Sequence, residues 1–356
     1  MEVYGIDLSK EKFDVSFLDV GKEKKKIVRN NFKGICNFLK QVQDDCILVA
    51  EHTGSYGDLL VHLCFRYGIK IALVSGYSIK HSLGLQRGKS DSKDAYRIRK
   101  YGERFAEELR FAEPKSESIK ELKELYTLRE QLSKNRTSLL LGQKARKIGP
   151  SQSIVAYRSC KRAIMNLENE ISSVEEEIEK VVKSDSELKD NYELVTSIIG
   201  IGPVIANNLI IKTENFKRIS TAKKAAAFAG VCPYPNSSGK MSMKAKTSHM
   251  ADKKLKSLLF LAAKTAVAHN KEYSLYAERK KLEGKPYFLI MNNVSNKMLR
   301  TVYGVIQSRK PYDMNHICND PRQMNWENNN FIWFLIEYIN KRWMMRRLYA
   351  VVTSKT

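Results

Sequence analysis

The chain has 356 residues, with 62 lysines and arginines against 39 aspartates and glutamates, a formal net charge of +23 at pH 7. This length allows two or three domains and excludes a mini-scaffold, while a basic excess that folding does not require implies a polyanionic partner. No apolar run reaches the roughly 18 residues of a membrane span and no apolar leader follows the start, so we expect a cytoplasmic protein without membrane contact.

The remaining composition narrows the partner to nucleic acid. Hydrophobic residues make up 43% of the chain, too many for a disordered basic tail. The six cysteines contain no C-x-x-C pair, which argues against a zinc site and a disulfide framework. An acidic membrane surface is disfavoured because no basic amphipathic helix with lipid-anchor signals is present, which leaves DNA and RNA.

The first 111 residues predict an α/β domain. The predicted order is strands at 3–6, 13–18 and 25–28, an amphipathic segment around Phe38, a buried strand at 46–50, a helix at 56–67 and a strand at 69–74. A hairpin meander followed by alternating helices and strands predicts a mixed sheet with helices on its faces, the layout of ribonuclease-H-like folds.

Four carboxylates lie at positions that such a sheet brings together. Asp7 and Glu51 each end an apolar strand, so both project from one edge if the strands are neighbours. A helix starting at Ser90 or Asp91 carries Asp91 and Asp94 on one face. Oxygen ligands suit Mg²⁺ or Mn²⁺, and two such ions assist phosphodiester displacement. Each acid taken alone is more simply explained as a turn or capping residue.

Basic residues crowd the last two acids. They include Arg87, Lys89, Lys93 and Arg97. A solvated charged face is the ordinary explanation of such a run, but its density beside acids favours contact with a phosphate backbone.

The middle of the chain predicts a helical hairpin. Apolar residues from Ile164 to Val181 recur at alternating intervals of three and four, the a/d spacing of a coiled coil. An earlier helix at 118–147 is separated from this segment by Gly149-Pro150. We interpret the hairpin as a spacer and oligomerisation device.

The third stretch predicts a mainly helical domain. Gly200-Ile201-Gly202 joins two helices, with Pro203 at the first position of the second, as in a helix-hairpin-helix whose glycines approach a phosphate. A tight turn alone also explains these glycines. Ser220 is expected to cap a helix at 221–229, and an irregular polar loop is expected at 232–240. Four lysines in and after this loop favour contact with a nucleic-acid backbone: Lys240, Lys244, Lys246 and Lys253.

The helix that carries Lys253 is expected to turn Leu255, Leu258, Leu259 and Leu261 to the core. Within the polar loop, Ser237-Ser238-Gly239 by itself predicts a turn. A serine hydroxyl needs a base or a metal to become a nucleophile, and no neighbour in sequence supplies a base.

Six motifs occur in order between residues 3 and 312: GIDLSK, AEHTGSYG, KSDSKDA, IIGIGPVIA, FAGVCPYPNSSGK and LEGKPY. Together they resemble the DEDD-type transposases of bacterial insertion sequences, the IS110 family, which includes Piv/MooV-type DNA invertases. The resemblance implies a RuvC-like domain at 1–113, a coiled-coil linker at 114–190 and a transposase domain with a catalytic serine at 191–312. Residues 313–356, expected to form a helical tail, lie outside it.

The resemblance also implies the chemistry. Asp7, Glu51, Asp91 and Asp94 would hold Mg²⁺, and Ser238 would be the nucleophile of a phosphoserine DNA intermediate, with Ser237 as its rival. A structured bridge RNA would pair with target and donor DNA in a bacterial, nucleoid-associated enzyme. Dimers assembling into a tetramer would place the carboxylates of one subunit opposite the serine of another.

Three alternatives remain open. A Piv-type site-specific invertase would need no RNA, and a RuvC-like metal-dependent nuclease or junction resolvase would use the carboxylates alone. A non-enzymatic nucleic-acid scaffold would need neither the carboxylates nor the serine.

Overall fold

The computed structural model describes residues 2–42, 45–82, 91–113, 116–146, 153–238 and 241–314. The chain divides into two compact units, an N-terminal unit of residues 1–120 and a C-terminal unit of residues 121–356. None of the helices described is both long and apolar enough to cross a membrane. The five cysteines in these ranges are free, and burial raises the pKa of the Cys64 thiol to about 12. The predicted tail lies outside the described residues beyond Met314.

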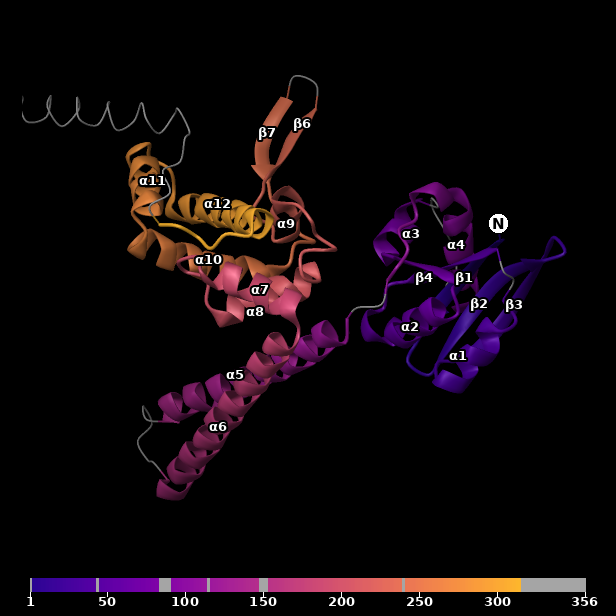
Figure 1. Cartoon of the computed structure of the whole chain (residues 1–356), viewed down its shortest axis with the longest axis horizontal. Coiled ribbons are helices and arrows are strands. Elements are labelled where there is room, and N and C mark those ends of the chain that lie inside the picture. Colours follow the sequence, from indigo (N-terminus) through magenta and orange to yellow (C-terminus); the bar gives the residue numbers. More distant parts are fainter. Residues whose placement is uncertain are drawn as a thin grey trace, which may run out of the picture. The chain divides into compact units, whose positions relative to one another are not determined.

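The N-terminal unit is built on a five-stranded mixed sheet, which confirms the predicted fold class (Figure 1). Its strands are β1 (Glu2–Leu8), β2 (Lys12–Asp19), β3 (Lys22–Arg29), β4 (Cys46–Glu51) and β5 (Lys70–Val74). They lie in the order β3-β2-β1-β4-β5, antiparallel from β3 to β1 and parallel from β1 to β5. This is the ribonuclease-H-like arrangement, a meander extended by two crossovers.

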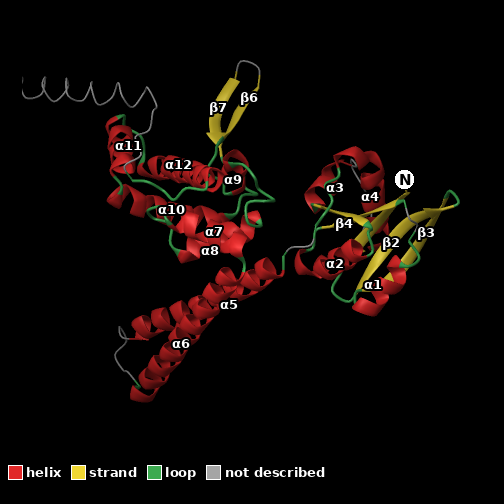
Figure 2. Cartoon of the chain, in the orientation of Figure 1, coloured by secondary structure: helices red, strands yellow, loops and turns green. Residues whose placement is uncertain are grey.

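Helices cover both faces of the sheet (Figure 2). Helices α1 (Phe32–Leu39) and α2 (Asp58–Arg66) pack on the face that carries Tyr4, Ile6 and Leu8. Helices α3 (Gly76–Ser82) and α4 (Asp91–Arg104) pack on the opposite face, where Ile79 and Ile98 meet Val3, Ile47 and Val49. Short 3₁₀ turns, η1 (Gly54–Gly57) and η2 (Ala106–Glu108), complete the connections. Helices α3 and η2 were not anticipated from the sequence.

Helix α4 lies directly on β1 because glycines remove the intervening side chains. A Cβ at Gly5 would collide with the backbone of Ala95 and Arg99, and a Cβ at Gly102 would lie 2.7 Å from Val3 and Val49 side chains. The buried Arg99 guanidinium donates a 3.2 Å hydrogen bond from Nε to Ser16 Oγ and pairs with Glu103. The helix is therefore seated closely on strands β1, β2 and β4.

Gly5→Ala is expected to destabilise the N-terminal unit by about 2 kcal/mol, which lowers its melting temperature by roughly 10 °C. The added methyl group meets backbone atoms that have no rotamer through which to withdraw. Thermal melting followed by circular dichroism measures the effect. Gly304→Ala, inside a helix and facing open space, is the control and should not lower stability. Equal melting of wild type and Gly5→Ala would contradict this seating of α4.

The C-terminal unit begins with a long helical hairpin. Helices α5 (Glu117–Arg146) and α6 (Ile154–Ser184) run side by side (Figure 1). The heptad residues Ile164, Val174, Ile178 and Val181 are buried along it. Arg129 pairs with Glu175 at 2.7 Å, and Arg136 Nε donates to Glu168 at 2.8 Å, both across the hairpin.

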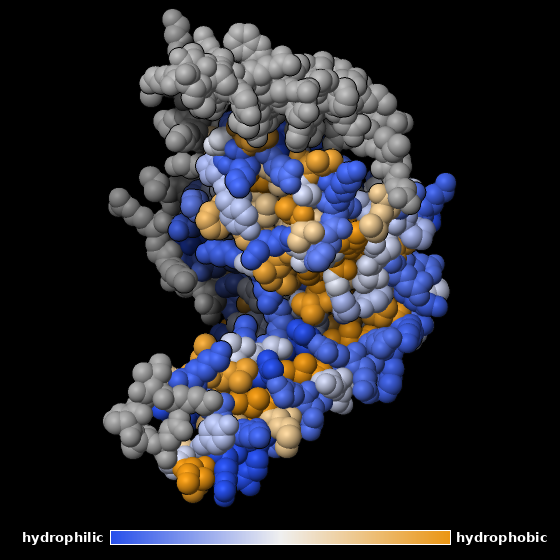
Figure 3. Space-filling view, turned by 90° about the vertical axis from the view of Figure 1, so that its left-hand side faces the viewer, coloured by the Kyte–Doolittle hydropathy of each residue, from blue (hydrophilic) through white to orange (hydrophobic). Residues whose placement is uncertain are grey.

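Apolar side chains also reach the surface near the far end of this hairpin, at the bottom of Figure 3. They include Leu141, Ile154, Val155 and Met165, all exposed in the isolated chain. A hairpin that served only as a soluble spacer would not need apolar side chains in contact with solvent.

The rest of the C-terminal unit is a helical body with one β-hairpin. Its helices are α7 (Ser186–Thr196), α8 (Pro203–Thr213), α9 (Ala222–Phe228), α10 (Lys253–His269), α11 (Lys271–Leu282) and α12 (Tyr287–Ser308), and its strands are β6 (Tyr234–Ser238) and β7 (Met241–Lys246). The two helices of the predicted helix-hairpin-helix are α7 and α8, with Pro203 in the first turn of α8.

Three local predictions for this body were wrong. The segment at 232–240 is not an irregular loop, because 234–238 pairs with 241–246 as an antiparallel hairpin. The cap of α9 is Thr221 rather than Ser220, since its hydroxyl accepts a 3.3 Å hydrogen bond from the Lys224 amide. Leu261 is 57% exposed, because the buried stripe of α10 runs through Leu255, Leu258 and Leu259 instead.

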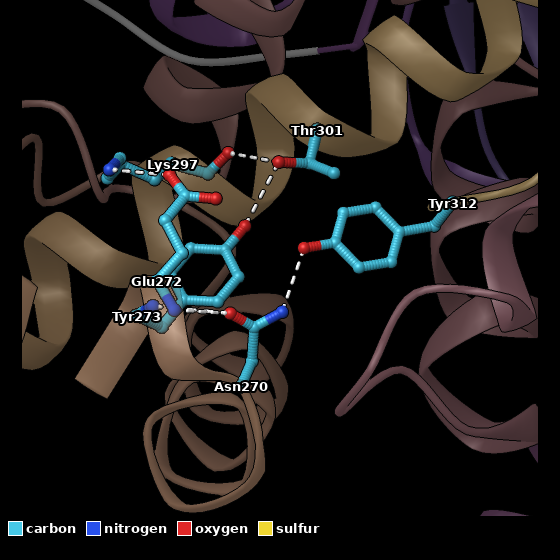
Figure 4. Close-up of polar contacts among 6 residues, drawn as sticks. All are labelled: Asn270, Glu272, Tyr273, Lys297, Thr301 and Tyr312. Atoms are coloured by element: carbon cyan, nitrogen blue, oxygen red, sulfur yellow. Dashed lines mark hydrogen bonds and ion pairs between the residues drawn. The ribbon is translucent and has the colours of Figure 1, made fainter. Parts of the chain in front are cut away.

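A polar network ties α11 to α12 and to the segment after it (Figure 4). Asn270 caps α11 and donates a 2.8 Å hydrogen bond to the Tyr312 hydroxyl. The Tyr273 hydroxyl contacts Thr301 Oγ1 at 3.0 Å, and burial raises the pKa of Tyr273. Lys297 pairs with Glu272 at 3.3 Å. These bonds stabilise the helical body, and each polar side chain named in this network has a partner.

Candidate functional site

The sheet brings Asp7 and Glu51 to one edge and one face. In the parallel pair β1/β4 the last registered residues are Ile6 and Ala50, and Asp7 and Glu51 follow them. Side chains alternate along a strand, so Asp7 shares the face of Val3, and Glu51 shares the face of Ile47 and Val49. Adjacent strands are about 4.8 Å apart. The prediction that both acids project from the same edge is consistent with this register.

Helix α4 delivers the other two acids toward this edge. Gly102 lies over Val3, near the start of β1, whereas Ala95 and Arg99 lie over Gly5, further along the strand. The helix therefore runs antiparallel to β1, and its first turn, with Asp91 and Asp94, points toward the end of β1 that carries Asp7. The Asp94 carboxylate pairs with Arg97 Nη1 at 2.7 Å.

Glu51 lies in a restricted space at this edge. A Cβ at Gly76, the first residue of α3, would collide with the Glu51 carboxylate. Two residues after Glu51, the hydroxyl of Thr53 is buried and has no hydrogen-bond partner within the described residues. The glycine leaves space for the Glu51 carboxylate, and the Thr53 hydroxyl is free to bond a small polar group at the carboxyl end of β4.

A fifth acid at this face was missed in the sequence. Asp14 on β2 pairs directly with Asp7 in the antiparallel register, so both side chains lie on the α4 face. Asp14 is only 9% exposed, and its Oδ2 lies 4.0 Å from Lys12 Nζ. The signal in the sequence was the alternation Phe13-Asp14-Val15-Ser16, because pairing this segment with β1 in a hairpin places Asp14 opposite Asp7.

The donor set has the chemistry of a hard-cation site. Carboxylate oxygens at one sheet edge fit Mg²⁺ or Mn²⁺. Among the side chains described, no three acidic, histidine or cysteine groups lie close enough to hold an ion. The side chain of Asp91 is outside the described part of the chain, so the predicted four-carboxylate set is not completed by the structure.

The predicted basic patch is partly described. Lys93 is exposed on α4, and Arg97 is half-buried in its ion pair with Asp94. Arg87 and Lys89 lie outside the described residues.

Ser238 lies at the tip of the hairpin β6–β7. It pairs with Met241 in the last backbone pair before the turn, and Ser237 pairs with Ser242 one step further from it. The hairpin projects from the helical body (Figure 1). Lys240 lies outside the described residues, and the backbones of Lys244 and Lys246 belong to β7. The backbone of Ser238 therefore lies at the end of the projecting hairpin.

The remaining predicted contacts lie around the helix starts of the C-terminal unit. Gly200 has a φ of +91°, and a Cβ there would lie 2.5 Å from the Ala262 carbonyl oxygen of α10, so packing alone accounts for this glycine. Gly202 faces open space at the start of α8. Lys253 is exposed at the first position of α10.

Asp252 caps the helix that Lys253 begins. Burial opposes ionisation of Asp252, yet its 2.8 Å ion pair with Lys212 and the hydrogen bond from the Leu255 amide hold its pKa below the ordinary value. Asp252 is therefore ionised near neutral pH and fixes the start of α10 beside the hairpin.

Two family models match the chain. One, described as "Transposase" and specific to DEDD transposases of IS110 type, matches residues 4–144. The other, described as "Transposase IS116/IS110/IS902 family", matches residues 192–278. The first covers most of the sheet with its acidic edge, and the second covers the part of the helical body from α7 into α11, including the serine hairpin.

Two of three curated relatives extend over most of the chain. The pilin gene-inverting proteins of Moraxella bovis and Moraxella lacunata are each 24% identical over 320 residues, which cover 87% of this chain and 97% of theirs. An insertion element IS900 uncharacterized 42 kDa protein of Mycobacterium paratuberculosis is 22% identical over 179 residues, 49% of this chain and 44% of that protein. Among solved structures, T. thermophilus RuvC in complex with a Holliday junction substrate is 12% identical with a TM-score of 0.26, covering 32% of this chain and 99% of RuvC.

Proposed function

We infer that this chain, which carries both domains of the IS116/IS110/IS902 transposase family and belongs to it, exchanges DNA strands through a covalent link to Ser238. The observation that carries the proposal is the pairing of two features in one chain. Asp7 and Glu51 end neighbouring strands at one sheet edge of the N-terminal unit, and Ser238 lies at the tip of a projecting hairpin in the C-terminal unit. Neither feature alone supplies both an activating group and a nucleophile.

The proposed step conserves phosphodiester bonds. Ser238 Oγ attacks a DNA phosphorus, its proton is lost to solvent or to a nearby base, and the bond from phosphorus to one sugar oxygen breaks to leave a free hydroxyl. Attack of another strand's hydroxyl on the phosphoserine then restores a DNA bond and frees the serine. No high-energy cofactor is consumed, because each broken bond is replaced.

Asp7, Glu51, Asp91 and Asp94 would hold Mg²⁺ or Mn²⁺ in this proposal. A bound divalent cation lowers the cost of charge at the attacking and leaving oxygens. The chain contributes the sheet edge that positions Asp7 and Glu51, and the seating of α4 on Gly5 that orients the helical acids. Lys93, Arg97 and the lysines near the hairpin would contact the DNA backbone.

We further propose that a structured non-coding RNA selects donor and target DNA by base pairing. The net charge of +23 supports binding of more than one nucleic-acid strand. In that arrangement the protein binds backbone and shape while the RNA reads sequence.

We propose a homo-oligomer, with dimers assembling into a tetramer. The apolar residues exposed near the end of the α5–α6 hairpin support a second copy as their partner. The carboxylates and the serine would then be contributed to one centre by different copies of the chain.

The function is tested by adduct formation. The full chain with its co-purified RNA is incubated with DNA carrying the insertion element and its flanks, and the products are separated under denaturing conditions. We expect a protein–DNA adduct in Mg²⁺ and none with a chelator. Cleaved DNA with free ends and no adduct would favour a metal-dependent nuclease or junction resolvase instead.

Site-specific inversion without RNA is the second candidate. It is favoured by the match to pilin gene-inverting proteins along 97% of their length. Ribonuclease treatment separates the two functions. An RNA-guided enzyme loses adduct formation after treatment, whereas an invertase that recognises DNA directly retains it.

Gly76→Ala is expected to raise the Mg²⁺ concentration needed for half-maximal adduct formation by about tenfold or more. The three atoms nearest to the added methyl group all belong to the Glu51 side chain, so the change displaces the Glu51 carboxylate. Gly57→Ala, which meets only leucine side chains, is the matched control and should keep the wild-type requirement. An unchanged Mg²⁺ dependence in Gly76→Ala would remove Glu51 from the metal site.

A further inference from the structure

Three aromatic rings are grouped at the surface where α12 begins. Phe288 is 73% exposed and Tyr287 is 51% exposed, although both neighbour Phe260 of α10. The ring centroids of Phe260 and Phe288 are 5.8 Å apart in a stacked arrangement, and Tyr287 contacts both at 6.2 and 5.7 Å. Large aromatic rings held together in solvent mark a surface that a ligand covers.

Phe260 and Phe288 line a pocket of about 600 Å³. Its rim carries two basic side chains, Lys256 and His249, and one amide, Asn292. The Asn292 amide is oriented by a 2.9 Å hydrogen bond to the Val231 carbonyl oxygen. No acidic residue belongs to this lining among the residues described. Planar apolar walls with a basic rim match an aromatic ligand that is attached to an anion.

The pocket lies at the foot of the serine hairpin. Pro233, directly before β6, and Ala245, near the end of β7, both line it. Ser238 is five residues beyond Pro233, a reach of roughly 17 Å along an extended strand. A nucleic-acid strand engaged by the hairpin tip can therefore reach the pocket within a few nucleotides.

We propose that this pocket binds an unstacked base of the single DNA strand that the serine hairpin engages. Phe288 and Phe260 stack on the base, and Lys256 contacts an adjacent phosphate. The inference rests on the proposed function, because that function places DNA at the hairpin. It adds a binding site for a nucleobase, separate from the carboxylates and from the serine.

A second protein copy is the competing occupant, and the charge of the rim disfavours it. A protein surface that covers exposed rings usually brings its own apolar contacts, and it would have to neutralise Lys256 as well. A nucleotide satisfies both requirements at once, since its base is flat and its phosphate is anionic.

The test is the affinity of the full chain for a fluorescein-labelled, mixed-sequence, single-stranded DNA of about 20 nucleotides, measured by anisotropy. Phe288→Ala is expected to weaken binding about tenfold, the effect of losing one base-stacking ring. Phe288→Tyr keeps the ring and should bind within about twofold of wild type. Leu282→Ala is the matched control, because Leu282, the last residue of α11, is 76% exposed but belongs to neither the ring group nor the pocket.

Salt dependence separates stacking from charge. Lys256→Ala should reduce the slope of log affinity against log salt by about 0.7, the value for one phosphate of a single strand. Phe288→Ala should lower affinity at every salt concentration with the slope unchanged.

Three outcomes overturn the inference. In the first, Phe288→Ala binds DNA no more weakly than wild type. In the second, it changes the sedimentation coefficient without changing DNA affinity. In the third, it weakens binding of RNA of the same sequence and leaves DNA binding intact. If wild type forms the serine adduct in any of these cases, only the base pocket fails. If wild type binds no DNA at all, the proposed function fails as well.

Discussion

Ser238→Ala is expected to abolish the denaturation-resistant protein–DNA adduct, with a loss of about a thousandfold or more. The methyl group that replaces the hydroxymethyl has no oxygen to attack phosphorus. The backbone pair of residue 238 with Met241 does not depend on the side chain, so the hairpin should keep its form. Adduct yield on a denaturing gel measures the effect, and DNA affinity, measured in parallel, should stay near that of wild type.

Ser237→Ala is the matched control, because it removes the neighbouring hydroxyl from the same strand. We expect this variant to form the adduct nearly as well as wild type. The reverse pattern would make Ser237 the nucleophile, and adduct formation by both variants would show that neither Ser237 nor Ser238 is the sole nucleophile.

Asp7→Asn and Glu51→Gln are each expected to slow adduct formation by about a thousandfold, since stabilisation of the reacting oxygens by a divalent cation is worth several kcal/mol. Both changes keep the shape of the side chain and remove the charge that would bind the cation. Single-turnover kinetics at saturating DNA measure the chemical step apart from binding.

Asp19→Asn provides the control for charge removal. Asp19 ends β2, which runs antiparallel to β1, so it lies at the opposite edge of the sheet from Asp7. It pairs with Lys24 at the surface and should be dispensable. Full activity of Asp7→Asn would show that the acidic edge takes no part in the reaction.

Much of the N-terminal unit was predictable because its signals are local. Apolar runs such as Cys46–Ala50 mark buried strands, and an acid directly after such a run must lie at a strand end. Asp7 and Glu51 lie at one edge if the two strands that they end are parallel neighbours, and the observed strand order makes β1 and β4 neighbours. The distant approach of α4 to β1 at Gly5 has no local signal, since a glycine in a strand is compatible with several explanations.

The C-terminal unit was harder to predict where polar residues form regular structure. The segment from Tyr234 to Ser238 lacks the apolar alternation of a strand, so its pairing with β7 had no signal in the hydrophobic pattern. Asp14 was missed for a different reason. An acid beside Lys12 in a short strand resembles a solvated pair until the hairpin register places it against Asp7.

Mass spectrometry of the protease-digested adduct tests the central claim most directly. The account predicts that the peptide spanning the hairpin tip carries a nucleotide, with the phosphate attached to the Ser238 oxygen. Adducts whose only nucleotide-bearing peptide lies outside residues 234–246, or digests in which every peptide is unmodified while the DNA is cleaved, would contradict it.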